Sequence, residues 1–435
     1  MCNKYKILIS WERVVAFLLS LSPFLYMYRF PFIKANVAFY TYLLLFVITM
    51  VKRKGKIKSN DTNVLVLPLA VIMFFYCIFS FLLVDKSTIY NSGGSNLTSI
   101  CSTFVFIFLA VITFDNEKLR DCYRKNIEYI AMFMSIVVIA QYIFYYFFHT
   151  TITVDRSFLL PLKSLFTDGV ISYISVSDMM SNGMFRPSAF FLEPAHFSQF
   201  CSIGLASLLI REENIINKKT MLVTFGIILT TSGIGILTVL MLWGYVLVMN
   251  NETLSAKVLT RIIIGFVVLL LILVVFFLVS SAFRMAILRI TTEYDGHASA
   301  IEGRLWSRSF LEELSGKTKW FGAGFRNIPV YGSDKTTYYM TGIIELLYCQ
   351  GIVGTAIFGG MYLRMFIKAY KSWNKVTAIM LVLFLPYLVG SASLGVLTLC
   401  EYIPFLYIKN RDKKYKVGSF EKETICNSSN TIIIC

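Results

Sequence analysis

Residues 64–84 read VLVLPLAVIMFFYCIFSFLLV and contain no charged side chain. A helix of about 20 apolar residues spans the hydrocarbon core of a bilayer. The segment just before it, residues 52–58 (KRKGKIK), carries five cations. Lysines and arginines in a short connection mark the cytoplasmic end of a transmembrane helix. This stretch therefore predicts a membrane span that enters from the cytoplasm.

Similar apolar runs recur along the whole chain. The candidate spans lie at residues 13–28, 35–51, 64–84, 98–114, 127–148, 195–210, 220–232, 234–249, 258–283, 340–363, 376–391 and 394–408. The hairpins at 220–249 and 376–408 are each consistent with one long helix or with two short ones, although small residues favour a reversal in both. The sequence thus predicts an all-α polytopic membrane protein of about twelve transmembrane helices, folded as one integral membrane domain over residues 1–435.

The composition excludes an ordinary soluble domain. Of the 435 residues, 57% are hydrophobic and only 15% are charged, whereas soluble domains are about 25% charged. The net charge of +16 would suit nucleic-acid binding, but most cations lie in short segments between apolar runs, where they act as topology signals. We therefore expect a lipid bilayer as the environment, no nucleic-acid partner and an uncleaved first helix.

The cations also set the orientation. They cluster in the connecting segments at 52–58, 120–125, 211–219 and 364–375, and in the tail at 409–416. With about twelve spans, all of these segments and both termini fall on the cytoplasmic side.

Two long loops, residues 149–194 and 284–339, are expected on the opposite side. Connections longer than about 12–15 residues are usually functional or disordered. The second loop carries eight cations: Arg284, Arg289, Arg304, Arg308, Lys317, Lys319, Arg326 and Lys335. Because this placement runs against the usual bias, it suggests an anionic ligand.

The first long loop ends in RPSAFFLEPAH, residues 186–196. Pro194 suits the first turn of a helix, where its missing N–H needs no partner. Glu193 then lies beside the positive end of the helix dipole. Arg186, Glu193 and His196 are consistent with catalytic groups at a membrane entry. They are equally consistent with a helix cap and an arginine that reaches to the interface.

The second long loop contains two short motifs, GRLW at 303–306 and FGAGF at 321–325. Arg304 and Arg308 are four residues apart and share a face if helical. The planar guanidinium group suits phosphate oxygens. Gly322 and Gly324 would let the backbone approach a ligand closely. A solvated basic loop with a glycine turn is the alternative interpretation.

Few other side chains suggest chemistry. His149, His196 and His297 are the only histidines, and His297, in an external loop, is either a base near neutral pH or simply solvated. Glu345 and Glu401 lie in predicted spans, where a carboxylate is costly unless it faces a polar interior. Both a functional role and a packing role are open for them. No spacing of metal ligands is present, so no metal is expected.

In this arrangement the chain resembles the O-antigen and capsule polymerases, the Wzy family of the wider O-antigen ligase/polymerase superfamily. The resemblance covers the whole chain in topology, and its motifs are short. Arg186 with Glu193-Pro194 matches the first-loop motif, and Gly303-Arg304 with Trp306 matches the second. Many relatives have a His-Asn pair where the second loop re-enters the membrane. Here residues 337–342 read TYYMTG, which favours a polymerase over a ligase.

The resemblance implies a bacterial inner-membrane glycosyltransferase whose two long loops face the periplasm. Its substrate would be an undecaprenyl-diphosphate-linked oligosaccharide, and its product a longer chain of repeat units on the same kind of carrier. A chain-length regulator of the Wzz type is the implied protein partner. No cofactor is expected, and the implied reaction requires no nucleotide sugar.

The same resemblance suggests roles for individual residues. A lipid diphosphate leaving group needs cations, for which Arg186 and Arg304 are the expected residues, supported by Arg289 and Arg308. Glu193 is the expected base for the attacking sugar hydroxyl, with His196 or His297 as alternatives. The remaining residues expected to bind substrate are Trp306, Gly322, Gly324, Arg326 and Tyr338.

Two alternatives share parts of this prediction. A ligase has the same fold and chemistry and differs only in its acceptor. A lipid-linked oligosaccharide flippase would more often show repeated halves and ionisable groups near the middle of the bilayer. No mirrored halves are evident in the sequence, and its charge is concentrated in the loops.

Overall fold

The computed structural model describes residues 10–21, 25, 37–52, 62–83, 97–149, 180–181, 184–191, 193–211, 216–249, 308–331, 336–337, 340–372, 374–390 and 396–409, together with eight single residues between 260 and 288. The predicted span at 258–283 therefore lies almost wholly outside the described residues.

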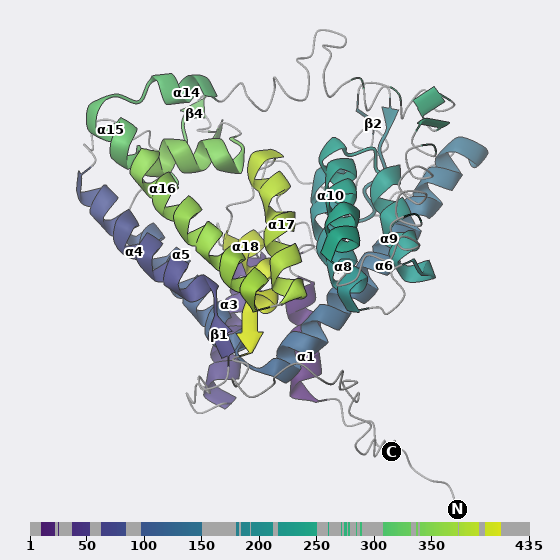
Figure 1. Ribbon diagram of the computed structural model, residues 1–435, viewed down its shortest axis with the longest axis horizontal. Coiled ribbons are helices and arrows are strands. Elements are labelled where there is room, and N and C mark those ends of the chain that lie inside the picture. Colours follow the sequence, from purple (N-terminus) through teal and green to yellow (C-terminus); the bar gives the residue numbers. More distant parts are fainter. Residues whose placement is uncertain are drawn as a thin grey trace, which may run out of the picture.

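The described chain is almost entirely helical (Figure 1). Its helices are α1 (Trp11–Ser20), α3 (Val37–Lys52), α4 (Val66–Leu83), α5 (Leu97–Phe114), α6 (Glu117–Phe148), α8 (Pro194–Arg211), α9 (Lys218–Leu229), α10 (Gly233–Met249), α14 (Ser309–Glu312), α15 (Gly316–Phe321), α16 (Gly342–Lys371), α17 (Lys375–Gly390) and α18 (Val396–Tyr402), followed by the 3-10 helix η4 (Ile403–Phe405). Three short antiparallel ladders accompany them: β1 (Thr62–Val64) with β6 (Tyr407–Lys409), β2 (Met180–Ser181) with β3 (Met184–Phe185), and β4 (Val330–Tyr331) with β5 (Thr336–Thr337).

The helices form two lobes that diverge toward one end of the molecule (Figure 1). One lobe contains α4, α5 and α16, with α14, α15 and β4 over its upper end as drawn. The other contains α6, α8, α9 and α10. Helix α17 joins the lobes because it packs against α16 on one side and against α8 and α10 on the other. The described parts of both long loops thus lie at the upper end, away from α1 and β6.

Four of the described helices, α4, α5, α6 and α16, are long and apolar enough to cross a membrane. Helices α3, α10 and α17 are apolar but shorter. Large side chains such as Phe75 (63% exposed) and Leu82 (75%) on α4 point outward. Soluble proteins rarely expose contiguous apolar faces of this kind. These features indicate a membrane-embedded helical protein, as the sequence predicts.

Helix α6 is about 48 Å long at 1.5 Å per residue, which exceeds a hydrocarbon core of about 30 Å. Its first turns carry charged residues, whereas its last turns, residues 141–148, read QYIFYYFF. Tyrosine-rich ends are typical of a membrane interface. In Figure 1 this aromatic end lies at the upper end of the second lobe, beside the motif of the first loop.

Local signals fix several helix starts. Asn217 accepts hydrogen bonds from the backbone N–H groups of Lys219 and Thr220, at 2.8 and 3.0 Å. The hydroxyl of Thr220 accepts in return from the backbone N–H of Asn217, which completes a capping box. Pro194 begins α8, as its ring geometry predicts.

The hairpin at 220–249, which the sequence left open, forms the two helices α9 and α10. Its reversal is buried rather than solvated: Thr230, Thr231 and Ser232 are all less than 7% exposed. The hydroxyl of Thr230 donates to the carbonyl of Ile227 at 2.6 Å and lies 3.3 Å from the hydroxyl of Ser198 on α8.

The last predicted span, 394–408, differs from the structure. Helix α18 ends at Tyr402, and the chain continues as η4 and then as strand β6. The α-helix ends two residues before Pro404, which has no N–H to continue the helical hydrogen bonding. Tertiary bonds then hold the new path, because the hydroxyl of Thr377 donates to Phe405 O at 2.8 Å and that of Tyr407 donates to Val111 O at 2.5 Å. A full-length helix at this position is therefore wrong for the described residues.

Candidate functional site

The motif of the first loop folds onto the aromatic end of α6. The ring of Phe185 stacks on Tyr145 with centroids 4.1 Å apart. A turn follows, in which the backbone N–H of Phe191 donates to Ser188 O at 2.9 Å and the hydroxyl of Ser188 donates to Phe191 O at 2.6 Å. The chain then enters α8. Arg186 is half-buried on one side of this turn.

Glu193 stands at the N-terminal end of α8. Its carbonyl oxygen accepts the backbone N–H groups of His196 and Phe197, at 3.1 and 3.2 Å, and its side chain is exposed. His196 lies one turn further along and interacts electrostatically with Glu193. The structure therefore brings these two candidate bases together, with Glu193 the one open to an incoming ligand.

The end of the second loop is fastened to a break in α16. Gly351 interrupts the helix with φ 66°. The carbonyl groups before the break are used by other elements: Ala323 N–H donates to Tyr348 O at 2.8 Å, and Gly324 N–H donates to Cys349 O at 3.1 Å. The segment that follows α15 therefore replaces part of the helical hydrogen bonding of α16.

We call the contact between residues 321–326 and the break in α16 the junction. Helix α4 also contacts it, through two side chains on one face. The hydroxyl of Tyr76 donates to Gln350 O at 2.5 Å, and the hydroxyl of Ser80 donates to Phe321 O at 2.7 Å. Gly322 packs against the backbone of Cys349 so closely that a side chain would overlap it. This contact accounts for a glycine at 322 without a ligand, so its contact with substrate stays a prediction.

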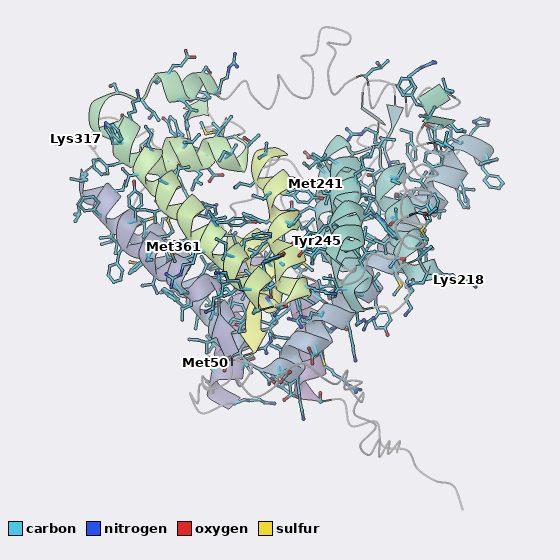
Figure 2. All side chains as sticks on the ribbon, in the orientation of Figure 1. Met50, Lys218, Met241, Tyr245, Lys317 and Met361 are labelled. Carbon is cyan, nitrogen blue, oxygen red and sulfur yellow. The ribbon has the colours of Figure 1, made fainter. Side chains whose placement is uncertain are left out.

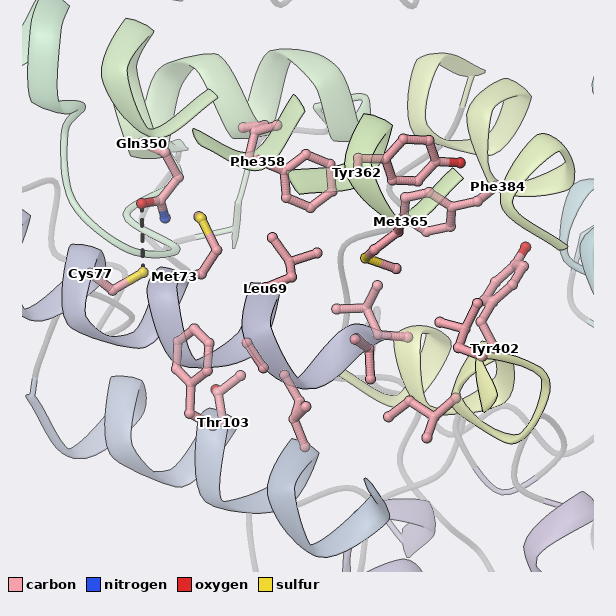
Figure 3. Close-up of a pocket in the computed structure, with 18 of the residues that line it drawn as sticks. Leu69, Met73, Cys77, Thr103, Gln350, Phe358, Tyr362, Met365, Phe384 and Tyr402 are labelled. Atoms are coloured by element: carbon pink, nitrogen blue, oxygen red, sulfur yellow. Dashed lines mark hydrogen bonds between the residues drawn. The ribbon is translucent and has the colours of Figure 1, made fainter. Parts of the chain in front are cut away.

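A cavity lies below the junction, between α4, α5, α16, α17 and α18 (Figure 3). It comprises about 1170 Å³ when its open side is included. Most of its wall is apolar and includes Leu69, Met73, Phe104, Phe358, Met365 and Phe384. Figure 3 shows it extending from Cys77 and Gln350, whose Sγ and Oε1 atoms are 3.6 Å apart, to Tyr402.

Two ionisable side chains line this cavity where the second loop covers it. Arg326, in the turn after α15, interacts electrostatically with Glu345 on α16. Arg326 has φ 54° and is an exposed residue at the edge of the cavity. The cavity thus combines a long apolar wall with a cation and a carboxylate.

The predicted site residues fall into three groups. Arg186, Glu193 and His196 lie together at the upper end of the second lobe. Gly322, Gly324 and Arg326 belong to the junction above the cavity of the first lobe, and Arg308 is exposed just before α14. Arg289, His297, Arg304, Trp306 and Tyr338 lie outside the described residues, so whether Arg304 meets Arg186 stays a prediction. In Figure 2, Lys317 marks the end of the molecule where the described parts of the second loop lie, and Met50 lies at the opposite end.

Several polar residues of the site were missed from the sequence. Tyr76 and Ser80 are spaced four apart in an otherwise apolar span, and this spacing puts them on one face. Gln350 and Gln141 are amides inside apolar helices, where each needs a partner. A polar side chain within an apolar span was therefore the sequence signal that could have identified these residues.

The described residues contain no group of three or more His, Cys, Asp or Glu side chains that could hold a metal ion. The described residues of the candidate site are arginines, carboxylates and an apolar cavity wall. Compared with known protein families and with curated proteins, the chain matches no family model and no curated sequence.

Proposed function

We propose that this protein is an O-antigen or capsule polymerase, which joins polyprenyl-diphosphate-linked oligosaccharides at the periplasmic face of a bacterial inner membrane. The observation that carries the proposal is the apolar cavity with Arg326 and Glu345 at its covered end. An isoprenoid chain requires an apolar groove at membrane depth, and its diphosphate requires a cation at the end of that groove.

The reaction explains why cations and a carboxylate are needed together. An acceptor hydroxyl attacks the anomeric carbon of the donor sugar, and the bond from that carbon to the diphosphate oxygen breaks. The hydroxyl proton passes to a base, and the lipid diphosphate leaves with the electron pair. Arg186 and Arg304 stabilise the leaving diphosphate, with Arg289 and Arg308 as support. Arg326, at the cavity of the other lobe, is a substrate-binding cation. Glu193, exposed at the start of α8, is the base.

The distribution of charge supports the proposed orientation. The lower ends of α3, α8 and α16 carry Lys52, Arg211 and Lys371, and cations of this kind mark a cytoplasmic side. The opposite end holds the aromatic end of α6 and both loops (Figure 1). With this orientation the loops face the periplasm, where a chain-length regulator of the Wzz type would be the partner.

The experiment is deletion of the gene in its native host, followed by complementation. Wild type should restore a ladder of long surface polysaccharide, whereas Arg186→Ala and Arg304→Ala should leave a lipid core with a single repeat unit. Lys317→Ala is the matched control, because Lys317 is an exposed cation of the second loop that is not among the residues expected to bind substrate or to act in catalysis. Long polymer that accumulates on the carrier lipid would instead identify a ligase. Repeat units trapped on the cytoplasmic side would identify a flippase and refute the proposal.

A further inference from the structure

A strained residue lies between the two candidate catalytic residues of the first loop. Ala189 comes three residues after Arg186 and four before Glu193, and its φ is 51°. Residues other than glycine, asparagine and aspartate rarely adopt this left-handed conformation. Ala189 is also fully buried, so water cannot satisfy its backbone groups. Such a conformation persists only where the surroundings hold it.

Gln141 on α6 holds both backbone polar groups of this one residue. Its Oε1 accepts the N–H of Ala189 at 3.0 Å, and its Nε2 donates to the carbonyl of Ala189 at 3.4 Å. The side chain is fully buried in the apolar part of the helix. A primary amide has an acceptor oxygen and two N–H donors, which makes it well suited to pair with the N–H and the carbonyl of a single residue.

The same helix contacts the loop a second time. Tyr145, one turn after Gln141, stacks on Phe185, the residue before Arg186. Helix α6 therefore fixes the chain on each side of Arg186, by an aromatic stack before it and by an amide clamp after it. Four residues beyond the clamp, the chain reaches Glu193 and enters α8.

We infer that Gln141 is a positioning residue, which holds Arg186 and Glu193 in register by clamping Ala189 in its left-handed conformation. This inference rests on the proposed function only for the roles of Arg186 and Glu193. The clamp fixes the loop beside α6, and with it the positions of Arg186 and of Glu193 at the start of α8. A displacement of about 1 Å in a catalytic group costs roughly 100-fold in rate, so a single amide can control turnover without touching substrate.

The first test measures the loop directly and does not depend on any reaction. Gln141→Met keeps the length of the side chain and removes both hydrogen bonds. Ser135→Ala is the matched control, because Ser135 is a fully buried polar side chain of α6 that lies outside the contact with the loop. Its hydroxyl donates to Ala131 O in its own helix, and it also interacts with Cys201, two turns into α8. Hydrogen exchange of the full-length protein in lipid nanodiscs should be faster in the peptide 186–193 for Gln141→Met and unchanged for Ser135→Ala. Equal protection of this peptide in Gln141→Met and wild type would overturn the inference.

The second test measures turnover on carrier-linked repeat units extracted from the host strain that lacks this gene. For Gln141→Met we expect kcat to fall roughly 100-fold, with little change in KM. The variant should unfold at a lower temperature than Ser135→Ala, because two buried backbone groups of Ala189 lose their partner, but it should stay folded at the assay temperature. Adding Ala189→Gly should recover about tenfold, because glycine adopts this φ without strain. Full activity of Gln141→Met, or no recovery with glycine at 189, would count against the clamp.

Arg186→Ala in the same assay separates the two ideas. If wild type elongates the substrate and Arg186→Ala does not, while Gln141→Met is fully active, only the role of Gln141 is refuted. If wild type does not elongate the substrate, or Arg186→Ala is as active as wild type, the proposed function or its site assignment fails. The exchange result still decides whether the clamp exists.

Discussion

The backbones of Gly322 and Gly351 are in close contact where the second loop meets the break in α16. A methyl group on Gly322 would overlap the carbonyl of Cys349, and one on Gly351 would lie 2.5 Å from the carbonyl oxygen of Trp320. Neither residue can therefore carry a side chain unless the backbones separate. Because Arg326 follows within this segment, the contact also sets where that arginine meets the cavity.

Gly351→Ala should separate the second loop from α16. The substitution adds a methyl group against backbone at a residue with φ 66°, so strain and overpacking together cost about 2–4 kcal/mol. Thermal unfolding in nanodiscs measures the loss. Gly359→Ala, in the same helix with nothing within 4 Å of the added atom, should raise stability by about 0.5–1 kcal/mol. Equal unfolding temperatures for the two variants would contradict the close contact.

Tyr76→Phe should loosen the same junction from the side of α4. The variant keeps the ring that packs against Gly354 but removes the donor to Gln350 O. A buried acceptor left without its partner costs about 1–3 kcal/mol. We expect a lower unfolding temperature and reduced chain elongation. Tyr129→Phe, at a residue of α6 that is 61% exposed, is the control and should change neither measurement.

Arg211→Met should lower the free energy of unfolding, because it leaves a buried carboxylate between α6 and α8 without its partner. Glu128 is 1% exposed, pairs with Arg211 and accepts a hydrogen bond from the hydroxyl of Ser207 at 2.7 Å. Removing the arginine leaves this carboxylate without its cation. Breaking a fully buried pair costs about 3–5 kcal/mol. Because the side chain of Arg211 is 42% exposed, we expect the loss of unfolding free energy to be about 3 kcal/mol or less.

The double variant Glu128→Gln with Arg211→Met checks that reasoning. It removes the charge that Arg211 balances, so it should be more stable than Arg211→Met alone. Lys218→Met, at an exposed cation of the same connection, should leave the unfolding temperature unchanged. If Lys218→Met were as destabilising as Arg211→Met, the loss would reflect net charge and not the ion pair.

Helix positions were predictable because apolar runs and caps are local. The run at 64–84 corresponds to α4 at Val66–Leu83, and Pro194 marked the start of α8. The hydrogen bonds that charged residues make inside the protein were not predictable. Arg120 and Arg124 looked like topology signals, yet Arg120 donates to Phe114 O at 2.7 Å and Arg124 to Pro404 O at 2.9 Å. The second contact joins residues 280 positions apart, which no local pattern can indicate.

The candidate site shows the same division. The motif at 186–196 was visible because an arginine, a carboxylate and a helix start lie close in sequence. The cavity was not visible, since its wall combines helices from both ends of the chain and its cover depends on the break at Gly351. An amide such as Gln141 could have been flagged as a polar residue in a span, but its partner, the backbone of Ala189, depends on how the loop folds back.

Filling the cavity tests whether it holds the lipid part of the substrate. Ala70 lines the cavity from α4 and is 4% exposed, so Ala70→Phe places a ring in space that the proposed isoprenoid chain occupies. Apolar contacts added inside the cavity should keep the protein as stable as wild type or make it more so. The KM for carrier-linked repeat units should rise about tenfold or more, the factor that corresponds to roughly 1.4 kcal/mol of lost binding.

Val71→Phe adds the same ring on the exposed side of α4 and should leave KM unchanged. An equal KM for both variants would show that the lipid chain binds elsewhere. A fall in unfolding temperature for Ala70→Phe alone would show that the space is too small to accept even one ring.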